Sequence, residues 1–557
     1  MNDLSLEFKS NLQKLFIEKK FSQVEIEIES LGNLQNLPEN IFYLYAISKS
    51  LNPQSKKKDL ILATDFLAQL YHKNKKNLEP LYNLVVVSLK ARTYKKTLKI
   101  LSEALDENPK NEKIIDGLAK FNYVLANIDE AYRYYKLLFE INPNQILSRS
   151  SFLTLLNYYP FITQSEYTEQ CKLFTNLIEK NLNDDFIFDK SQNQKIKLGF
   201  FSSDFKKHSV SYFIKDLIKN IDKNDFELSA FSNLDIFHHD ELTNEFKKIF
   251  DNWHDIINFK DSNLINFIRN KKVDILIDLN GYTFGNRLNI FANRVAPIQI
   301  LWLGYCNSVG LKNMDYIISD ENCIRDNEHH NYTEKIIYLP KIWNSMSKPL
   351  NLPSISELPY LKSKIFTFGS FNNFQKISSK TIEIWSKILI NTNSRLVLKN
   401  SIIDNEEINQ NLKEKFLDNK VKDEQIDILN FQKNNYDHLS FYNNIDIALD
   451  TFPYNGVTTT FESILMGVPV LTIKGFNFNS RCGESINKNL NLDNFIAKNY
   501  DDYYLKALDL YKDINYLKNL RKELRNKAFS SPLFDNKNFA KIFSKKIKTI
   551  WENFING

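Results

Sequence analysis

The chain has 557 residues, of which 43% are hydrophobic and 13% aromatic, and this content predicts folded cores and excludes wholesale disorder. Its length exceeds what one hydrophobic core holds, so roughly two to four domains are expected. With 73 basic and 67 acidic residues the formal net charge is +6, which gives no support to a nucleic-acid or membrane-surface role.

Cysteine usage and the N-terminal sequence bear on the cellular compartment. Cys171, Cys306, Cys323 and Cys482 show no paired spacing, so neither a disulfide framework nor a zinc site is expected. The opening MNDLSLEFKSNLQ carries charges where a signal peptide has its apolar core, and no apolar run approaches about 18 residues. We therefore expect a cytoplasmic protein without a metal site, a bound cofactor or a membrane span.

Residues 1–146 show an internal repeat. Asparagines and small residues recur at intervals of 34 positions, and a proline follows two of the asparagines. The positions are Asn74, Asn108 and Asn142, Ala63, Thr97 and Ala131, and Pro109 and Pro143. This period is typical of tetratricopeptide repeats, which are pairs of helices. Such an array either solubilises or dimerises a protein, or presents a concave surface that holds an extended polypeptide, and we favour the second interpretation.

Residues 147–194 are predicted to form a helical connector, and the pattern changes from Lys195 onward. Short β-rich runs such as KIKLGFFSSD and VDILIDLNG alternate with charged helical stretches, which indicates a parallel sheet with crossover helices. A break at 353–363 precedes a second alternating set that includes IFTFGSF and IDIALDT. We predict two Rossmann-like halves, 195–350 and 364–530, that face a cleft, with ligands at the carboxyl ends of the strands.

Polar residues follow several of these strands directly. His208 comes shortly after the first strand; a lone histidine is more often structural than catalytic, but this position leaves both roles open. Asn373 and Lys376 follow IFTFGSF. His254 stands at the edge of a predicted strand and carries no functional signal by itself. The histidines expected at the surface, in polar runs, are His238, His239, His329 and His330.

The stretch DTFPYNGVTTTFESILMGVPVLT, residues 450–472, has the features of a helix N-terminus. Three threonines stand where the helix should begin, and free backbone N–H groups together with the helix dipole favour a phosphate there. Ordinary N-capping by threonine explains the same pattern. Glu462, one turn into the helix, could accept hydrogen bonds from a ribose. The absence of GxxxxGK[ST], and of GxGxxG after the first strand, excludes P-loop and dinucleotide-dehydrogenase sites.

The chain from about residue 195 to 555 resembles the catalytic region of the O-linked N-acetylglucosamine transferases and the related Spindly-type protein O-fucosyltransferases. The motifs that match in order are LGFFSSDFKKHSVS, ILIDLNGYTFGNR, APIQILWLGY, FGSFNNFQKIS, DIALDTFPYNGVTTTFESILMGVPVLT and SSPLFDNKNFAKIFSKKIKTIWENF. The resemblance implies an α-helical tetratricopeptide array followed by an α/β GT-B fold, and a metal-independent, inverting protein glycosyltransferase. It further implies that residues 531–557 form a helix that packs back on the first half.

The resemblance assigns catalytic roles to three residues. His208 matches a histidine that acts as a base or positions a proton, and His254 matches a second active-site histidine. Lys376 matches the lysine that neutralises the nucleotide diphosphate.

Six further residues are implied in binding a nucleotide-sugar donor. Asn373 is the polar neighbour of the catalytic lysine, and His438 matches a histidine that stacks on the nucleobase. Glu462 stands where the N-acetylglucosamine enzymes have a ribose-binding aspartate. The diphosphate contacts fall in the threonine run, at Thr458, Thr459 and, by extension, Thr460.

Two departures from the family pattern leave the donor open. Asn435 and Phe441 stand where the N-acetylglucosamine enzymes carry a lysine and an arginine. We favour UDP-N-acetylglucosamine as donor, and Ser or Thr of polypeptides held by the repeats as acceptor. The alternatives are GDP-fucose, an asparagine acceptor, or a non-enzymatic repeat scaffold with a degenerate nucleotide-sugar sensor. A homodimer is also open, and the frequent Lys and Asn codons suggest an AT-rich bacterial genome.

Overall fold

The computed structural model describes residues 4–32, 34, 37–180, 182, 188, 194–399, 405–430, 432 and 434–557. The chain forms two compact units. The first comprises Met1–Pro143 together with Asn405–Leu412, and the second comprises Asn144–Asp404 and Lys413–Gly557.

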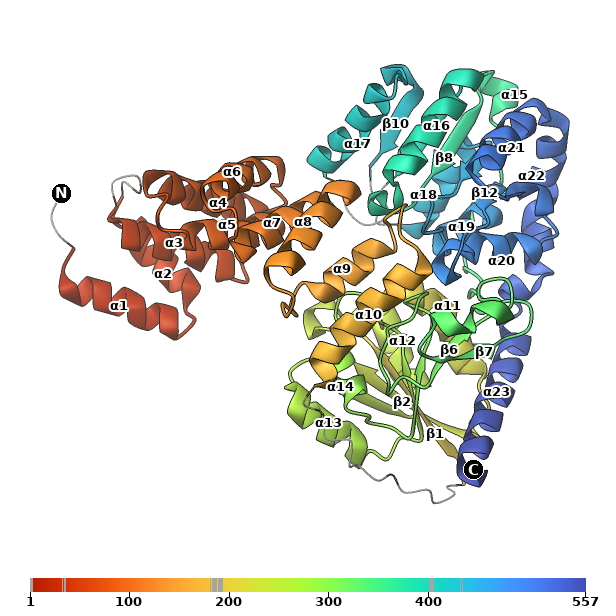
Figure 1. The fold of residues 1–557 in the computed structure, drawn as a ribbon, viewed down its shortest axis with the longest axis horizontal. Coiled ribbons are helices and arrows are strands. Elements are labelled where there is room, and N and C mark those ends of the chain that lie inside the picture. Colours follow the sequence, from red (N-terminus) through yellow and green to blue (C-terminus); the bar gives the residue numbers. More distant parts are fainter. Residues whose placement is uncertain are drawn as a thin grey trace. The chain divides into compact units, whose positions relative to one another are not determined.

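The first unit is a series of helices, each of which packs against its neighbours in the sequence (Figure 1). Their bounds are α1 (Leu6–Ile17), α2 (Phe21–Glu29), α3 (Glu39–Leu51), α4 (Lys57–Lys73), α5 (Glu79–Ala91), α6 (Lys95–Glu107), α7 (Glu112–Val124) and α8 (Ile128–Ile141).

The 34-residue period has a structural meaning in these helices. Asn74, Asn108 and Asn142 are the C-cap residues of α4, α6 and α8, so each marks the end of the second helix of a pair. The small residues of the period are buried inside the same three helices, at Ala63, Thr97 and Ala131. Small side chains at these places allow the helices to approach each other closely.

The second unit begins with two helices, α9 (Arg149–Leu156) and α10 (Gln164–Glu179). They occupy the described part of the predicted connector; residues 181, 183–187 and 189–193 of that connector lie outside the described residues.

The first sheet of the second unit is fully parallel, with the strand order β3-β2-β1-β4-β5-β6-β7. Its strands are β1 (Ile196–Ser202), β2 (Phe226–Ser232), β3 (Asn252–Asp255), β4 (Ile275–Asp278), β5 (Ile298–Leu301), β6 (Tyr316–Ser319) and β7 (Lys335–Tyr338). The helices along it are α11 (Ser209–Asn220), α12 (Glu241–Ile249), α13 (Asp261–Asn270) and α14 (Leu288–Ala292). The strand order reverses beside β1, which makes the loop after β1 a preferred ligand position.

The second sheet is also parallel, with the order β10-β9-β8-β11-β12-β13 and a reversal beside β8. Its strands are β8 (Thr367–Ser370), β9 (Arg395–Lys399), β10 (Ile426–Leu429), β11 (Ile447–Leu449), β12 (Val470–Ile473) and β13 (Ile496–Ala497). The helices are α15 (Tyr360–Ser363), α16 (Ser379–Thr392), α17 (Glu406–Asp418), α18 (Asn435–Ser440), α19 (Thr458–Leu465), α20 (Cys482–Lys488), α21 (Tyr500–Lys512), α22 (Ile514–Phe529) and α23 (Asn536–Asn556).

Within the second unit, buried polar contacts join the half that contains the first sheet to the half that contains the second sheet. Arg481, before α20, donates two hydrogen bonds to the carboxylate of Glu328, at 2.6 and 2.7 Å. The hydroxyl of Ser485 donates to Asp320, which follows β6, at 2.6 Å. A bidentate guanidinium–carboxylate pair fixes orientation as well as distance, so these contacts hold the halves in one geometry.

Helix α23 returns from the second half to the first (Figure 1). It packs on α11, and its Phe543 lies against the fully buried Trp302 with ring centroids 5.2 Å apart. At its far end Lys548 pairs with Asp225 at 3.1 Å.

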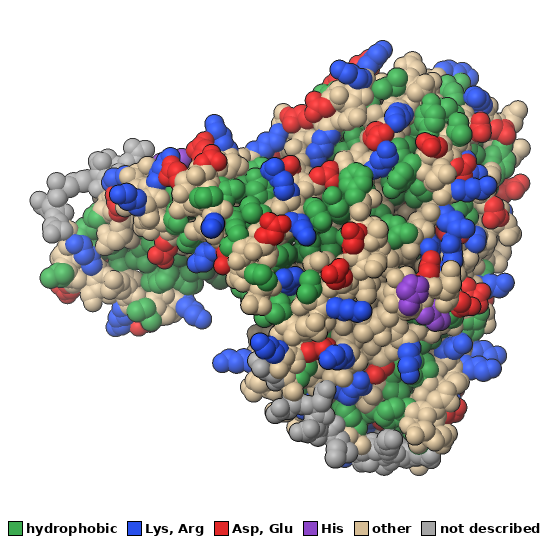
Figure 2. All heavy atoms as spheres, in the orientation of Figure 1, with side chains coloured by type: hydrophobic (Ala, Val, Ile, Leu, Met, Phe, Trp, Pro, Cys, Tyr) green, Lys and Arg blue, Asp and Glu red, His purple; other side chains and the backbone are tan. Residues whose placement is uncertain are grey.

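Charges of both signs are mixed on the face of the molecule that Figure 2 draws. The four cysteines are free and buried. Among the residues that the structure describes, no helix combines the length and the apolar character needed to span a bilayer.

Candidate active site

The loop between β11 and α19 is built around one buried carboxylate. Asp450 accepts hydrogen bonds from the backbone N–H groups of Thr451 (2.9 Å) and Gly456 (2.7 Å), and from the hydroxyl of Thr472 (2.7 Å). Burial raises the pKa of Asp450 to about 6, against the effect of these hydrogen bonds. The loop is therefore held in one shape at the carboxyl end of the strand, before the helix begins.

The threonine run forms the first turn of α19. Thr458, Thr459 and Thr460 are its first three residues, the N-cap residue is Val457, and no side chain caps the helix in the described structure. The Thr460 hydroxyl donates back to the carbonyl of Gly456 (2.8 Å), and the Thr459 hydroxyl donates to Oδ1 of Asn372 (2.9 Å). Ordinary N-capping thus does not explain the threonines, whereas an open helix N-terminus suits an anion.

Gly456 permits the close packing beneath this helix end. A Cβ atom at Gly456 would lie 2.4 Å from Oγ1 of Thr459 and 2.7 Å from Oδ1 of Asn372. A side chain at this position would therefore separate the two groups that hydrogen-bond there.

Lys376 contacts the same loop from another element. It ends a short 3₁₀ helix, η4 (Phe374–Lys376), that follows β8. Its Nζ donates to the carbonyl of Asn455 (2.9 Å) and stands 4.2 Å from the ring centroid of Tyr454. Burial lowers the pKa of Lys376 to about 8, and the carboxylate of Asp450 opposes that shift. The fold thus brings the predicted lysine to the segment that leads into the threonine run.

The two asparagines before Lys376 have different surroundings. Asn373 caps η4, accepting from the N–H of Gln375 at 3.4 Å. Asn372, its buried neighbour, faces Thr459 and Ser370. The donor-binding role predicted for Asn373 stays a prediction, and Asn372 is the asparagine that the structure places against the threonines.

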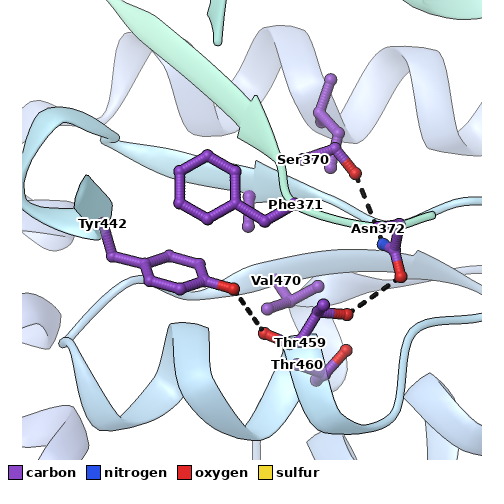
Figure 3. A pocket seen from close by; sticks show the side chains of 9 residues that line it. Ser370, Phe371, Asn372, Tyr442, Thr459, Thr460 and Val470 are labelled. Carbon is purple, nitrogen blue, oxygen red and sulfur yellow. Dashed lines mark hydrogen bonds between the residues drawn. The ribbon is translucent and has the colours of Figure 1, made fainter. Parts of the chain in front are cut away.

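A small recess opens beside these groups, at the carboxyl ends of β8 and β11 (Figure 3). Its empty space, part of which is open to solvent, is about 210 Å³. Its lining residues are Ser370, Phe371, Asn372, Tyr442, Ala448, Leu449, Thr459, Thr460 and Val470.

His438 and Glu462 form a pair next to the recess. Nε2 of His438 lies 3.0 Å from Oε2 of Glu462, and both side chains are largely buried. The Tyr442 hydroxyl lies within hydrogen-bond distance of the Thr459 carbonyl (3.2 Å) and of the same Glu462 oxygen (3.4 Å). The carboxylate predicted to meet a ribose is thus already engaged by the histidine predicted to stack on a base.

His208 caps the helix of the first half. It is the N-cap residue of α11, and its Nδ1 accepts from the N–H of Val210 at 3.4 Å. Burial lowers the pKa of His208, while Asp204, with Oδ2 3.7 Å from Nδ1, opposes the shift. A neutral ring that accepts at Nδ1 carries its proton on Nε2, so this nitrogen is a donor. The side chain is 42% exposed and accessible to a substrate.

Helices α11 and α19 bring the two halves of the predicted site together. Phe213 of α11 and Phe461 of α19, each about one turn from its helix start, pack edge to face with centroids 5.2 Å apart. Burial raises the pKa of Tyr212, and the carboxylate of Glu462 adds to that effect. The helix starts that carry His208 and the threonines therefore lie in one neighbourhood.

The other histidines are placed differently. His254, on the edge strand β3, packs against the rings of Phe231 (5.2 Å) and Phe267 (5.4 Å), and burial lowers its pKa. Its ring contacts do not join it to another predicted site residue, so its active-site role stays a prediction. The surface position predicted for His239 is wrong, because its side chain is half-buried. The other three histidines predicted at the surface are exposed: His238, His329 and His330.

Sequence reasoning missed four residues of this site, and each had a weak signal. Asp450 and Lys399 are charged residues at the ends of apolar strands, where parallel sheets bind ligands. Asn372 stands directly before the predicted Asn373, and Tyr454 lies in the stretch between the predicted strand and the threonine run. Their contacts come from different elements, so no spacing in the sequence reports them.

A family model described as glycosyl transferase family 41 matches residues 167–348 and 352–543. A Solanum lycopersicum protein named probable UDP-N-acetylglucosamine–peptide N-acetylglucosaminyltransferase SPINDLY is 33% identical over 373 residues, 66% of this chain and 40% of that protein. An Arabidopsis thaliana protein with the same enzyme name, SEC, is 26% identical over 380 residues, 65% of this chain and 38% of that protein. The chain thus spans about two fifths of the length of these relatives.

The fold has a counterpart among solved structures. A mutant of the Thermobaculum terrenum O-GlcNAc transferase superposes with a TM-score of 0.82 at 23% identity, covering 94% of this chain and 99% of that one. This likeness confirms the predicted fold class, a helical repeat array followed by an α/β GT-B fold. Because the family model matches more than half of its residues, this chain belongs to glycosyl transferase family 41.

Proposed function

We propose that the protein transfers a sugar from a nucleoside diphosphate sugar to the side chain of a polypeptide, with UDP-N-acetylglucosamine as donor and Ser or Thr as acceptor. The observation that carries the proposal is the convergence of Lys376 and the uncapped N-terminus of α19 on one loop. An ammonium group and free backbone N–H groups together form a site for a diphosphate. Family membership and the printed names of the relatives support the same reaction.

The reaction would proceed as a single inverting displacement. The acceptor oxygen attacks the anomeric carbon as the bond from that carbon to the diphosphate oxygen breaks. The bonding electrons leave with the diphosphate, and the proton of the acceptor hydroxyl passes to a phosphate oxygen of the donor or to solvent. Lys376 and the start of α19 would stabilise the negative charge that grows on the leaving group. Fixed groups of this kind usually make the largest electrostatic contribution to a transfer reaction.

His208 would act from the opposite half of the site. Since its Nδ1 accepts from Val210, its Nε2–H is available to donate. We propose that this group orients an oxygen of the acceptor or of the sugar. That role differs from general-base action, which needs an unprotonated nitrogen facing the substrate.

A second donor, GDP-fucose, is favoured by one feature of the base-binding end. Asn435 and Phe441, on α18 and the turn after it, supply neither of the cations that the resemblance implies for the UDP-N-acetylglucosamine enzymes. The cation that contacts His438 is Lys399, at the end of strand β9. The residues at the base-binding end therefore depart from the pattern of the UDP-N-acetylglucosamine enzymes. A nucleobase other than uracil would account for this departure.

One assay compares these proposals. The purified chain is incubated with each donor and a lysate as acceptor, with and without EDTA, and both nucleotide release and intact protein masses are measured. Release from UDP-N-acetylglucosamine, unchanged by EDTA and accompanied by an N-acetylhexosamine mass increment, is the expected result. Release from GDP-fucose alone would select the second donor. If neither donor releases its nucleotide, the result favours the non-enzymatic alternative, a repeat scaffold with a degenerate nucleotide-sugar sensor.

The repeats and the oligomeric state belong to the same proposal. We propose that the helices of residues 1–146 hold the polypeptide acceptor, as their repeat architecture suits extended ligands. The assembly state, including a homodimer, can be read from light scattering of the full chain.

A further inference from the structure

Next to the recess, charged and polar side chains from four different elements form a connected network. Nζ of Lys399, the last residue of β9, hydrogen-bonds to Nδ1 of His438 on α18. Nε2 of that histidine meets Glu462 of α19 at 3.0 Å, and the same carboxylate oxygen lies 3.4 Å from the hydroxyl of Tyr442.

Lys399 is an unusual member of this network. Its side chain is fully buried, and His438 is its hydrogen-bond partner in the described structure. The ammonium otherwise lies 5.8 Å from the ring centroid of Phe371 and 5.4 Å from that of Phe441. Burial lowers the pKa of Lys399 to about 8, although the carboxylate of Glu462 opposes the shift. Burying an ammonium group with few polar partners lowers the stability of the fold. An apolar side chain of similar size at this position would not carry that cost.

The contacts of His438 fix both of its nitrogens. An ammonium can only donate, so Nδ1 is the acceptor in its bond with Lys399, and the proton of the neutral ring is on Nε2. That N–H points to the Glu462 carboxylate, which can only accept. With both nitrogens satisfied inside the protein, the ring can offer a ligand its face but no hydrogen bond.

The ring is also continuous with the wall of the recess. Its centroid lies 6.1 Å from that of Phe371 and 6.0 Å from that of Tyr442, and both of these aromatic residues line the recess. Figure 3 shows the two rings side by side above the start of α19. The clamp on His438 therefore sets the position of an aromatic surface next to the proposed diphosphate site.

We propose that Lys399 is a positioning residue for donor binding: with Glu462 it holds the ring of His438 in the orientation in which a nucleobase stacks on it. The inference rests on the proposed function, because it takes the ligand of the recess to be a nucleoside diphosphate. A stacking platform without hydrogen bonds tolerates more than one base. Selection between uracil and guanine then falls to other groups around the platform.

The test measures nucleotide binding separately from transfer. UDP and GDP are titrated calorimetrically into the full chain, using wild type, Lys399→Met, Lys399→Gln and the control Lys387→Met. Lys387 is exposed on α16 and pairs with Glu383 at 2.7 Å. Lys399→Met removes the donor to Nδ1, whereas Lys399→Gln retains an N–H donor without the charge.

We expect Lys399→Met to weaken binding about tenfold and to raise the KM for the donor similarly, with kcat changed less than about threefold. Lys399→Gln should recover most of the affinity, and Lys387→Met should bind as wild type does. Nitrogen-15 shifts of labelled histidine should show Nε2–H in the wild-type His438 and a mixture of tautomers in Lys399→Met. This readout would not change if Lys399 only stabilised the fold.

The outcomes separate the two proposals. If wild type binds neither UDP nor GDP, the proposed function fails. If wild type binds one of them and Lys399→Met binds it equally tightly, the positioning role is overturned while the function stands. A loss confined to kcat, or a variant with wild-type tautomers and weakened binding, would also overturn it.

Discussion

At the scale of single residues, the ammonium of Lys376 is partly desolvated before any ligand arrives. Among the residues that the structure describes, its Nζ donates to the Asn455 carbonyl and lies over the ring of Tyr454. An ammonium with N–H groups still available can turn to a diphosphate without breaking an ion pair, so it can bind at little cost in reorganisation.

Replacing this lysine should therefore reduce catalysis more than stability. For Lys376→Met we expect kcat to fall about 10²- to 10³-fold, the size found when one preorganised donor to a developing charge is removed. The measurement is donor-dependent nucleotide release, with circular dichroism to verify the fold. Lys380→Met is the matched control, since Lys380 pairs with Glu383 at 2.8 Å and should leave turnover unchanged. Undiminished release from Lys376→Met would refute the assignment.

The pH dependence follows from the same residue. Burial depresses the pKa of Lys376 to about 8, while Asp450, Cys482 and Cys306 act in the opposite direction. The ammonium is therefore fully charged well below pH 8 and loses its charge as the pH rises through that value. We expect kcat/KM for the donor to fall about tenfold per pH unit above roughly pH 8.5.

Lys399 has the same depressed pKa of about 8, so the profile is measured in both the wild type and Lys399→Met. The alkaline decline should persist in that variant if Lys376 causes it. A profile that stays flat to pH 10 in the wild type would contradict the role of Lys376.

Gly456 provides a steric test of the helix start. In Gly456→Ala the new methyl group would meet Thr459 and Asn372 within 2.7 Å, so their hydrogen bond must break or the loop must move. We expect a loss of about 1–3 kcal/mol in unfolding free energy and a clear drop in nucleotide affinity. Gly32→Ala is the control: its Cβ has no neighbour within 4 Å, and its positive φ costs stability alone. Wild-type affinity in Gly456→Ala would show that the Asn372–Thr459 contact is dispensable.

At the scale of elements, α23 shows how a segment late in the chain supports the first half. Phe543 and Trp302 are both fully buried and pack against each other. We expect Phe543→Ala to destabilise the first half by about 3–5 kcal/mol, the range for large-to-small changes in a core. Urea unfolding followed by tryptophan fluorescence measures it, and Lys541→Ala on the exposed face of α23 should shift the midpoint little. Equal midpoints for both variants would mean that α23 is not required there.

The same scale shows which predictions the sequence could support. The strand KIKLGFFSSD and the helix that begins at the threonine run are local patterns, and they are found as β1 and α19. The threonines do not cap the helix, because Val457 is the N-cap residue. The hydroxyls of Thr459 and Thr460 donate instead to Asn372 and to the carbonyl of Gly456. Which of two adjacent asparagines faces the helix depends on the turn after β8, and composition carries no information on that turn.

At the scale of the whole molecule, the chain divides into two compact units, so the donor and acceptor functions can be separated experimentally. For a chain that begins at Asn144 we expect nucleotide binding to persist and transfer to proteins to fall at least about tenfold, because an array of repeats holds extended ligands. Residues 405–412 group with the first unit, so nucleotide binding by the shortened chain is measured first. Transfer at the full rate would remove the repeats from acceptor binding.

The sequence by itself determined the order of architectures, because a 34-residue period and the alternation of apolar strands with charged helices are local and repeated signals. It also indicated that Lys376 and the threonine run follow two strands of one parallel sheet, whose carboxyl ends meet at one edge. Only the tertiary structure decided that Asn372 accepts from Thr459, that Tyr454 lies under Lys376, and that Lys399 hydrogen-bonds to His438. These contacts join elements that are distant in the chain, and the angles at which strands and helices pack decide which side chains meet.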